Sequence, residues 1–260
     1  MIRFEIRDRV ALATIDRTER RNALNAELCD VLHDHLGTLD VDVVGAIVIT
    51  GAGSAFCSGA DLARRAADTG GDGGGIEHGG GDSFRPAFDR LLQTIVEHPL
   101  PVIAAVNGPA MGAGMQLAVA CDFRVVGPKA RFAIPAARLG VVLSSPNIAR
   151  LERLVGPGVA RDVLLAAATL DVEAADRAGL VHRRAEDALG AAMVWGDELA
   201  RLAPITVRGH KHALNLVARG LTPDAVVELR ALEERAFMSD DLGEGLAAFD
   251  EKRPPEFRGR

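Results

Sequence analysis

The chain has 260 residues, of which 48% are hydrophobic and 25% charged, which is ordinary for a soluble globular protein. Its formal net charge of −6 argues against nucleic acid as the main partner, because neutralising phosphates requires a clustered basic face. The apolar region 101–121 is interrupted by Pro101, Asn107 and Pro109, so we expect no membrane span of ~20 residues.

The first fifty residues alternate strands with a helix. Residues 2–7 and 10–16 predict two strands around a tight turn. In residues 25–39, apolar positions recur at helical spacing as far as Gly37. Residues 43–51 are a short continuous apolar run, which predicts a strand covered on both faces.

Residues 68–83, "DTGGDGGGIEHGGGDS", form a segment with almost nothing to bury. Such a composition predicts a mobile surface loop, and a lid over a binding site is one role open to it.

The middle and the end of the chain differ in their patterns. Up to about Ser145 the chain alternates helices and strands, and beyond it the periodicity is helical. The segments before this change are predicted as a helix at 84–99, a strand at 101–106, a helix at 113–121, and strands at 122–127 and 130–135. We therefore predict a sheet-containing core, residues 1–195, and a C-terminal helical region, residues 196–260, whose apolar stripes pack on a neighbouring subunit.

The cysteines Cys29, Cys57 and Cys121 are odd in number and have no paired spacing. They fit reduced thiols of a cytoplasmic protein better than a disulfide framework or a zinc site. The N-terminal segment "MIRFEIRDRV" alternates charged and apolar residues, so it does not resemble a signal peptide. No metal-ligand motif is visible, and we expect no bound metal.

Two segments, "AFCSGADL" at 55–62 and "MGAGMQLA" at 111–118, share one design. Each runs through a turn of small residues into a predicted helix, where backbone N–H groups are unpaired and the helix dipole favours negative charge. Two such N–H groups can converge on one carbonyl oxygen and form an oxyanion hole. A nucleotide-phosphate site is disfavoured, because "GAGSAF" lacks the G-x-G-x-x-G spacing and the chain has no P-loop.

Six segments carry a resemblance to a known family: "RRNALN", "AFCSGADL", "PVIAAVNGPAMGAGMQLAVACDFRV", "ARFAIPAARLG", "ADRAGLVHR" and "EKRPPEFRG". With them the sequence resembles the enoyl-CoA hydratase/isomerase (crotonase) superfamily over nearly its whole length. The resemblance implies an α/β fold built as a spiral of ββα units, with a helical trimerisation region. It also implies a homotrimer, or a hexamer built as a dimer of trimers, and a coenzyme A thioester as ligand, with no permanently bound cofactor.

The resemblance also implies a site. The oxyanion-hole donors of the family fall on the backbone N–H groups of Ser58 and Ala113. Most members have glycine where this chain has Ala113, and the change preserves a backbone donor provided that its Cβ clears the thioester. The acyl-CoA-binding positions that it implies are Arg21, Ala23, Ala60, Asp61 and Leu62.

Two acidic residues of the family hydratases are replaced here. Their positions hold Gln116 and Ala136. Hydration of an enoyl thioester needs a base to activate water and an acid to protonate the α-carbon, and such roles are typically worth ~10²–10⁴ each. Neither an amide nor a methyl group can supply them, so we expect negligible hydratase turnover. Gln116 then either hydrogen-bonds the thioester region, a water or nearby main chain, or is a satisfied polar group at a helix start.

The acyl pocket also departs from the family pattern. The segment "GVVLSSPNIARL" replaces a glycine-rich segment that is common in hydratases, so Leu143 and Ser144 are expected to reshape the acyl pocket. A serine nucleophile would need a nearby base, and none is visible by spacing. A second source of proton transfer is the glycine-rich loop, whose side chains could swing in or merely keep the loop soluble: Asp68, Asp72, Glu77, His78 and Asp82.

Three hypotheses follow. The first is a protein of lipid metabolism that binds fatty acyl-CoA without hydrating it. It is similar to superfamily members that lack both glutamates, including ones tied to long-chain, mycolic-type lipid assembly. The alternative is an active hydratase, isomerase or other thioester-processing enzyme with relocated acid and base groups. The third is an oligomeric scaffold with a vestigial site, against which the two intact turns argue.

Overall fold

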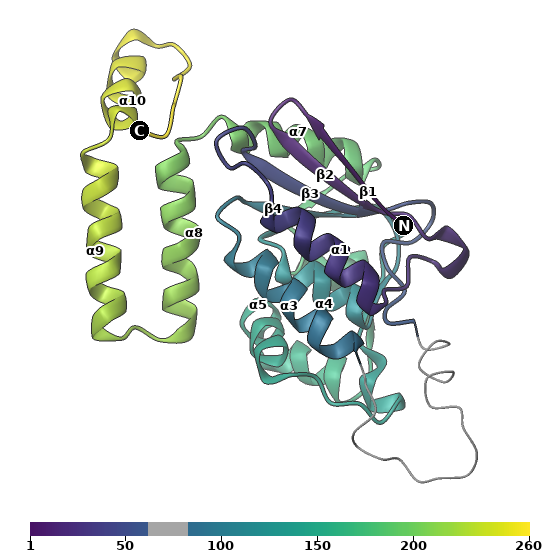
Figure 1. The fold of residues 1–260 in the computed structure, drawn as a ribbon. Helices are drawn as coiled ribbons and strands as arrows, with labels where there is room; N and C mark the ends of the chain where they lie inside the picture. The colour runs from purple at the N-terminus through teal and green to yellow at the C-terminus, as the bar shows by residue number, and fades with distance from the viewer. Residues whose placement is uncertain (62–82) are drawn as a thin grey trace.

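The computed structural model describes residues 1–61 and 83–260, which form a core of two sheets with packed helices and a C-terminal helical arm (Figure 1). The larger sheet has the order β1-β2-β3-β4-β6-β9. Strands β1 and β2 are antiparallel, and every later neighbour in this sheet is parallel. Its strands are Ile2–Arg7, Val10–Ile15, Ala46–Gly51, Val102–Val106, Phe123–Val126 and Arg183–Arg184. The two predicted N-terminal strands are thus confirmed.

The central strands β2, β3 and β4 of the large sheet are buried on both faces, as the apolar run at 43–51 predicts for β3. Along β3, Ile47 and Ile49 belong to the main core cluster, whereas Val48 between them belongs to a second cluster. Helices α1 (Ala26–Gly37) and α3 (Phe84–Glu97) pack together on the face of the sheet that carries Ile47 and Ile49. Helix α7 (Ala188–Ala200) covers the opposite face, which carries Val48.

A small sheet lies beside the large one and has the order β5-β7-β8. Strand β5 (Ala110–Met111) runs parallel to β7 (Phe132–Ala133), which pairs antiparallel with β8 (Thr169–Leu170). Strands β5, β8 and β9 were not predicted, because two-residue strands show no periodicity. The small sheet matters because β5 leads directly into helix α4 (Ala113–Ala120).

The helices predicted beyond Ser145 are present. Helix α5 (Ser145–Leu164) contains a break at Gly156, whose φ of 75° is not helical, so two helical segments meet there. Helix α6 (Val172–Arg177) follows. Two short 3-10 turns, Thr18–Arg20 and Pro135–Arg138, lie among the earlier elements.

The C-terminal arm consists of α8 (Pro204–Arg219), α9 (Pro223–Phe237) and α10 (Asp240–Glu251). Helices α8 and α9 run antiparallel beside the core (Figure 1). Position 195, where we divide the chain, lies inside α7, which packs on the sheet, so that division stays a prediction. In the part of the chain that the structure describes, no helix is long and apolar enough to cross a membrane.

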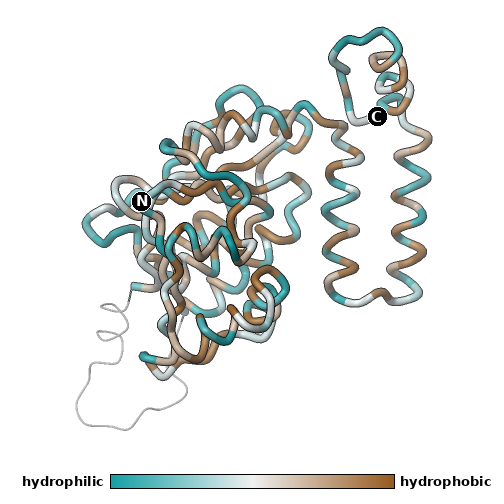
Figure 2. Tube along the Cα trace, turned by 180° about the vertical axis from the view of Figure 1, so that it is seen from behind, coloured by the Kyte–Doolittle hydropathy of each residue, from teal (hydrophilic) through white to brown (hydrophobic). Residues whose placement is uncertain are grey.

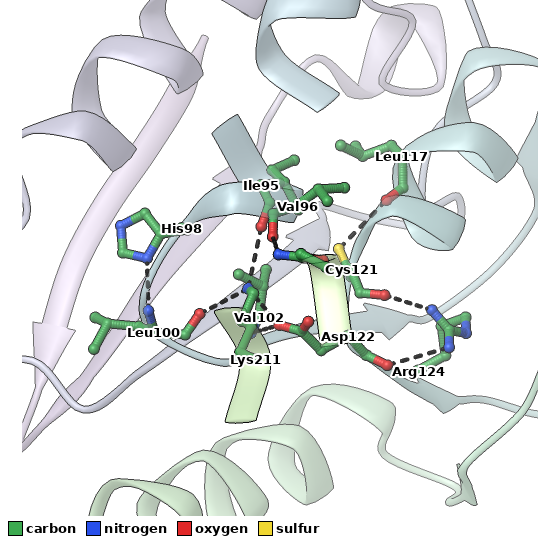
Figure 3. A network of polar contacts seen from close by, with 11 residues as sticks. Ile95, Val96, His98, Leu100, Val102, Leu117, Cys121, Asp122, Arg124 and Lys211 are labelled. Atoms are coloured by element: carbon green, nitrogen blue, oxygen red, sulfur yellow. Dashed lines mark hydrogen bonds and ion pairs between the residues drawn. The ribbon is translucent and has the colours of Figure 1, made fainter. Parts of the chain in front are cut away.

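The arm is attached to the core through Lys211 of α8 (Figure 3). Its ammonium group donates to the carbonyl oxygens of Leu100 at 2.9 Å and Ile95 at 3.2 Å. Asn215, one turn further along α8, donates to the carbonyl oxygen of Val96 at 2.7 Å. The arm therefore caps the end of α3 and the start of β4 with polar contacts.

Candidate functional site

The two predicted glycine turns meet in the structure. The N–H of Met111 donates to the carbonyl oxygen of Cys57 at 2.8 Å, and the N–H of Cys57 donates to that of Pro109 at 3.1 Å. Beyond this pairing Gly59 faces Ala113, since a Cβ built on Gly59 would lie 3.8 Å from the nitrogen of Ala113. Segments about fifty residues apart in the sequence thus form one surface.

Glycine is required at this contact for reasons of space and backbone conformation. A Cβ at Gly114 would lie 2.2 Å from the carbonyl oxygen of Cys57, far inside van der Waals contact. Gly59 has a φ of 111°, which side chains with a Cβ rarely adopt. The small residues therefore allow the turns to pack against each other.

The backbone N–H groups without an acceptor among residues 1–61 and 83–260 include, at the meeting point, those of Ala60 and Ala113. Ala113 is the first residue of α4, where a helix N–H has no intrahelical partner and the dipole favours negative charge. The N–H of Ala60 belongs to the peptide that joins Ala60 to Gly59, and the backbone of Gly59 faces Ala113. These two donors are available to a carbonyl oxygen.

Ser58 requires a correction. Its N–H donates to the carbonyl oxygen of Arg21 at 3.0 Å, and its hydroxyl donates to the carbonyl oxygen of Arg20 at 3.0 Å. Because this N–H is already paired, the prediction that Ser58 is an oxyanion donor does not fit the structure. The free N–H in this turn belongs to Ala60, two residues later.

The segment around Arg21 borders the first turn. The N–H of Leu24 donates to the carbonyl oxygen of Gly59, and the N–H of Asp61 to that of Leu24, both at 2.8 Å. Ala23 is buried and the side chain of Arg21 is exposed. Thus Arg21, Ala23, Ala60 and Asp61, all predicted to bind acyl-CoA, lie in paired or adjacent backbone segments, whereas Leu62 lies outside the described residues.

Asp61 is held by an ion pair. Arg17 Nη1 lies 2.7 Å from Asp61 Oδ2, and the same nitrogen donates to the carbonyl oxygen of Ala23 at 3.2 Å. The Asp61 carboxylate is 7% exposed, so it is engaged with the protein and directed away from bulk solvent. This ion pair ties the end of the first turn to the segment that contains Arg17 and Ala23.

Gln116 lies one turn into α4 and belongs to a hydrogen-bonded network. Its Oε1 accepts from Asn147 Nδ2 at 3.0 Å, and its Nε2 donates to the carbonyl oxygen of Gly112 at 3.4 Å. Asn147 Nδ2 also donates to Asp89 Oδ1 at 3.3 Å. The prediction that Gln116 contacts nearby main chain is therefore confirmed for Gly112.

Two charged side chains complete this network. Arg150 Nη1 donates to Asn147 Oδ1 at 2.8 Å, and burial lowers the pKa of the Arg150 guanidinium. Asp89 accepts a further hydrogen bond from the hydroxyl of Ser144 at 3.1 Å. The carboxylate nearest to Gln116 in the network is therefore that of Asp89, one side chain away.

Ala136 and Leu143, the remaining predicted site positions, are half-buried and pack against the main core cluster. Between them the chain exposes three large apolar side chains, those of Leu139, Val141 and Val142. Ala136 presents no ionisable group. The loop side chains Asp68, Asp72, Glu77, His78 and Asp82 lie outside the described residues.

The thiol of the first turn, that of Cys57, is buried. Burial raises the pKa of Cys57 to about 12, so the thiol stays protonated at neutral pH. In the described part of the chain, no group of three or more His, Cys, Asp or Glu side chains is placed to hold a metal ion.

Asp89, Asn147 and Arg150 carry no sequence motif that marks them as site residues. Asp89 lies next to the buried Phe88 on an amphipathic helix, and helical periodicity assigns no partner to such a border position. Only the contact of α4 with both α3 and α5 brings the three side chains together.

Comparison with known proteins gives one consistent result. The family model described as "Enoyl-CoA hydratase/isomerase" matches residues 5–260. The chain is 38% identical over 263 residues to "Probable enoyl-CoA hydratase echA6" of Mycobacterium tuberculosis (strain CDC 1551 / Oshkosh), with 100% of both chains covered. It is 38% identical over 271 residues to "Probable enoyl-CoA hydratase" of Rhodobacter capsulatus, with 100% of this chain and 98% of the relative covered.

Solved structures agree with the sequence matches. The enoyl-CoA hydratase from Polaromonas sp. JS666 has a TM-score of 0.89 at 27% identity, covering 99% of each chain. The enoyl-CoA hydratase from Mycobacterium tuberculosis H37Rv has a TM-score of 0.83 at 31% identity, covering 100% of this chain and 99% of that one. The predicted crotonase fold class is thereby confirmed.

Proposed function

The chain belongs to the enoyl-CoA hydratase/isomerase family, and from that premise we propose that it binds fatty acyl-CoA thioesters in lipid metabolism without hydrating them. The family acts on CoA thioesters, so such a thioester is the ligand class of this chain.

One observation carries the binding half of the proposal: the unpaired N–H groups of Ala60 and Ala113, which lie where the two turns meet. We propose that both donate to the thioester carbonyl oxygen. Each such donor is typically worth ~10²–10³ in rate when chemistry follows, and it also holds the ligand in place. The exposed side chain of Arg21 and the segment ending at Asp61 would lie along the coenzyme A portion.

The second part of the proposal, the lack of hydration, concerns the side chains of Gln116 and Ala136. We propose that Gln116 and Ala136 occupy the positions of the two hydratase glutamates. The Gln116 amide is bonded to Asn147 and Gly112, and Ala136 has only a methyl group. A carbonyl polarised by two amides still needs a proton donor and an activated water, and neither position supplies them.

Two measurements on the purified full chain test this proposal. Calorimetry with butyryl-CoA is expected to detect binding, and crotonyl-CoA is expected to keep its enoyl absorbance. Turnover of crotonyl-CoA at neutral pH would overturn the binding-only proposal. Absence of affinity for any acyl-CoA would favour the scaffold instead.

Asp89 favours a second candidate, an active hydratase or isomerase with a relocated acid or base. Its carboxylate is one side chain away from Gln116 and accepts from Ser144 and Asn147. If wild-type protein turns over an enoyl-CoA, Asp89→Asn should abolish that activity while preserving butyryl-CoA binding. Unchanged turnover in Asp89→Asn would remove this candidate.

We further propose a homotrimer, or a hexamer of two trimers, assembled through the arm. Apolar positions recur along α8 and α9 (Figure 2). Phe237, Met238 and Phe249 are 73%, 86% and 82% exposed, which an isolated arm would leave in water. Light scattering should give three or six chains, and Phe237→Glu with Phe249→Glu should give a smaller assembly. We propose the cytoplasm as its compartment, since its three buried cysteines are free thiols.

A further inference from the structure

The orientation of the Gln116 amide is set by a chain of hydrogen bonds that begins at a cation. Arg150 has donors only, so the Asn147 atom that it contacts at 2.8 Å must be the oxygen. The other end of the Asn147 amide, Nδ2, then faces Gln116 at 3.0 Å. Because Nδ2 can only donate, the Gln116 atom that it contacts must be Oε1.

The same orientation follows from an anion. Asn147 Nδ2 also contacts Asp89 Oδ1 at 3.3 Å, and a carboxylate only accepts hydrogen bonds. A flipped Asn147 would place its oxygen against this carboxylate and its amino group against Arg150. Charges at both ends therefore fix the direction of the network, and Gln116 cannot turn its oxygen toward a ligand without losing its bond from Asn147.

This fixed orientation leaves Gln116 as a donor. Its Nε2 carries two hydrogens, and among the described residues only the carbonyl oxygen of Gly112 accepts from it, at a long 3.4 Å. That carbonyl also accepts from the backbone N–H of Gln116 at 3.2 Å. Since Gly112 immediately precedes Ala113, Nε2 lies beside the first turn of α4.

We propose that Gln116 makes the site selective for acyl-CoA thioesters that carry an oxygen acceptor on the third acyl carbon, with 3-oxoacyl-CoA the preferred class. This inference rests on the proposed function, in which the N–H of Ala113 holds the thioester oxygen. A donor one helical turn away then faces the acyl carbons next to the thioester. A ketone there offers lone pairs to Nε2, whereas a hydrocarbon leaves that donor without a partner, which costs affinity.

Calorimetry on the full chain at neutral pH tests the proposal with three ligands: acetoacetyl-CoA, butyryl-CoA and 3-methylbutyryl-CoA. The last has a methyl group where acetoacetyl-CoA has its 3-oxygen, so it controls for shape. Acetoacetyl-CoA is expected to bind about five- to tenfold more tightly than either hydrocarbon, as one net hydrogen bond predicts. Equal affinities for all three would overturn the inference and leave the proposed function standing, and no affinity for any of them would overturn both.

Two variants separate donation from shape. Gln116→Glu keeps the side-chain outline and its bond from Asn147, but replaces the donor with a carboxylate. The Gln116→Glu variant should lose the preference for acetoacetyl-CoA. It should still bind 3-hydroxybutyryl-CoA, whose hydroxyl can donate to the carboxylate. Asn147→Ala frees Gln116 to rotate, so it should reduce the preference for acetoacetyl-CoA over butyryl-CoA. An unchanged preference for acetoacetyl-CoA in Gln116→Glu would contradict the assignment.

Discussion

Lys211 Nζ lies 2.6 Å from Asp122 Oδ2, and this ion pair joins the helical arm to the core (Figure 3). Lys211 is 8% exposed, and Asp122 also accepts from the N–H of Val102 at 2.7 Å. One side chain of α8 therefore reaches the loop between α4 and β6 as well as the start of β4. This contact is one of several that hold α8 against the core.

Replacing Lys211 should destabilise the protein. Lys211→Met leaves the Asp122 carboxylate and two carbonyl groups without their shared donor. Breaking a buried pair in this way is expected to lower the free energy of unfolding by about 3 kcal/mol, measured by urea denaturation. The double variant Lys211→Met with Asp122→Asn should recover part of the loss, because no charge is then left unpaired. Equal losses in the single and double variants would contradict this account.

His98 predicts a pH dependence of stability. Its Nε2 donates to the carbonyl oxygen of Leu36 and its Nδ1 accepts from the N–H of Leu100, each at 3.1 Å, which requires the neutral ring. Burial, with the charge of Lys211 adding to it, lowers the pKa of His98 from 6.5 to about 4. The unfolded chain takes up a proton below pH 6.5 and the folded chain does not, so stability should fall between pH 6.5 and about 4, by about 3 kcal/mol in total.

The variant His98→Gln tests this source of acid sensitivity. A glutamine amide can also donate and accept but does not titrate, so the loss of stability between pH 6.5 and 4 should be smaller in the variant. The pKa of His182 is also lowered to about 4, but that histidine is present in both proteins and cancels in the comparison. Parallel pH profiles for the two proteins would show that His98 is not the cause.

Removing one proposed carbonyl donor should weaken ligand binding without unfolding the chain. Ala113 is the first residue of α4, a position at which proline is well tolerated, and Ala113→Pro deletes its N–H. Affinity for butyryl-CoA should fall at least about fivefold. Ala26→Pro, at the first position of α1, is the matched control and should bind normally. Full affinity in Ala113→Pro would argue against the donor.

Restoring two carboxylates should restore hydration. The double variant Gln116→Glu with Ala136→Glu supplies a base and an acid where we propose that the family hydratases have them. Hydration of crotonyl-CoA should rise by about 10²–10⁴ over the wild type. The variant should also bind butyryl-CoA, which confirms that it is folded. Normal binding without hydration would show that these two positions are not the ones that face the reacting carbons.

The elements of the core could be predicted from the sequence because their patterns are local. The apolar run of β3 and the amphipathic period of α3 are each visible within a single segment. The pairing of the two turns was visible as repeated composition, and the family resemblance named the positions that flank them. These predictions needed no contact between distant residues.

The contacts between elements could not be predicted in this way. The sequence does not reveal that the Ser58 N–H donates to the carbonyl oxygen of Arg21, because that bond forms only when folding brings two distant segments together. Nor does it reveal that Asp89, from α3, meets Asn147, from α5, beside Gln116. Periodicity describes one face of one helix, whereas these pairings depend on how helices cross.

The tight fit of Gly114 against Cys57 has a consequence for how such proteins diverge. No side chain can be added at position 114 without separating the two turns, whatever the ligand. Under the proposed assignment of positions 116 and 136, proton chemistry is lost in this chain while the contact between the turns is kept. The glycine motif therefore indicates a shared backbone arrangement and not a shared activity. Under the proposed assignment, positions 116 and 136 are the ones that distinguish active hydratases from inactive relatives.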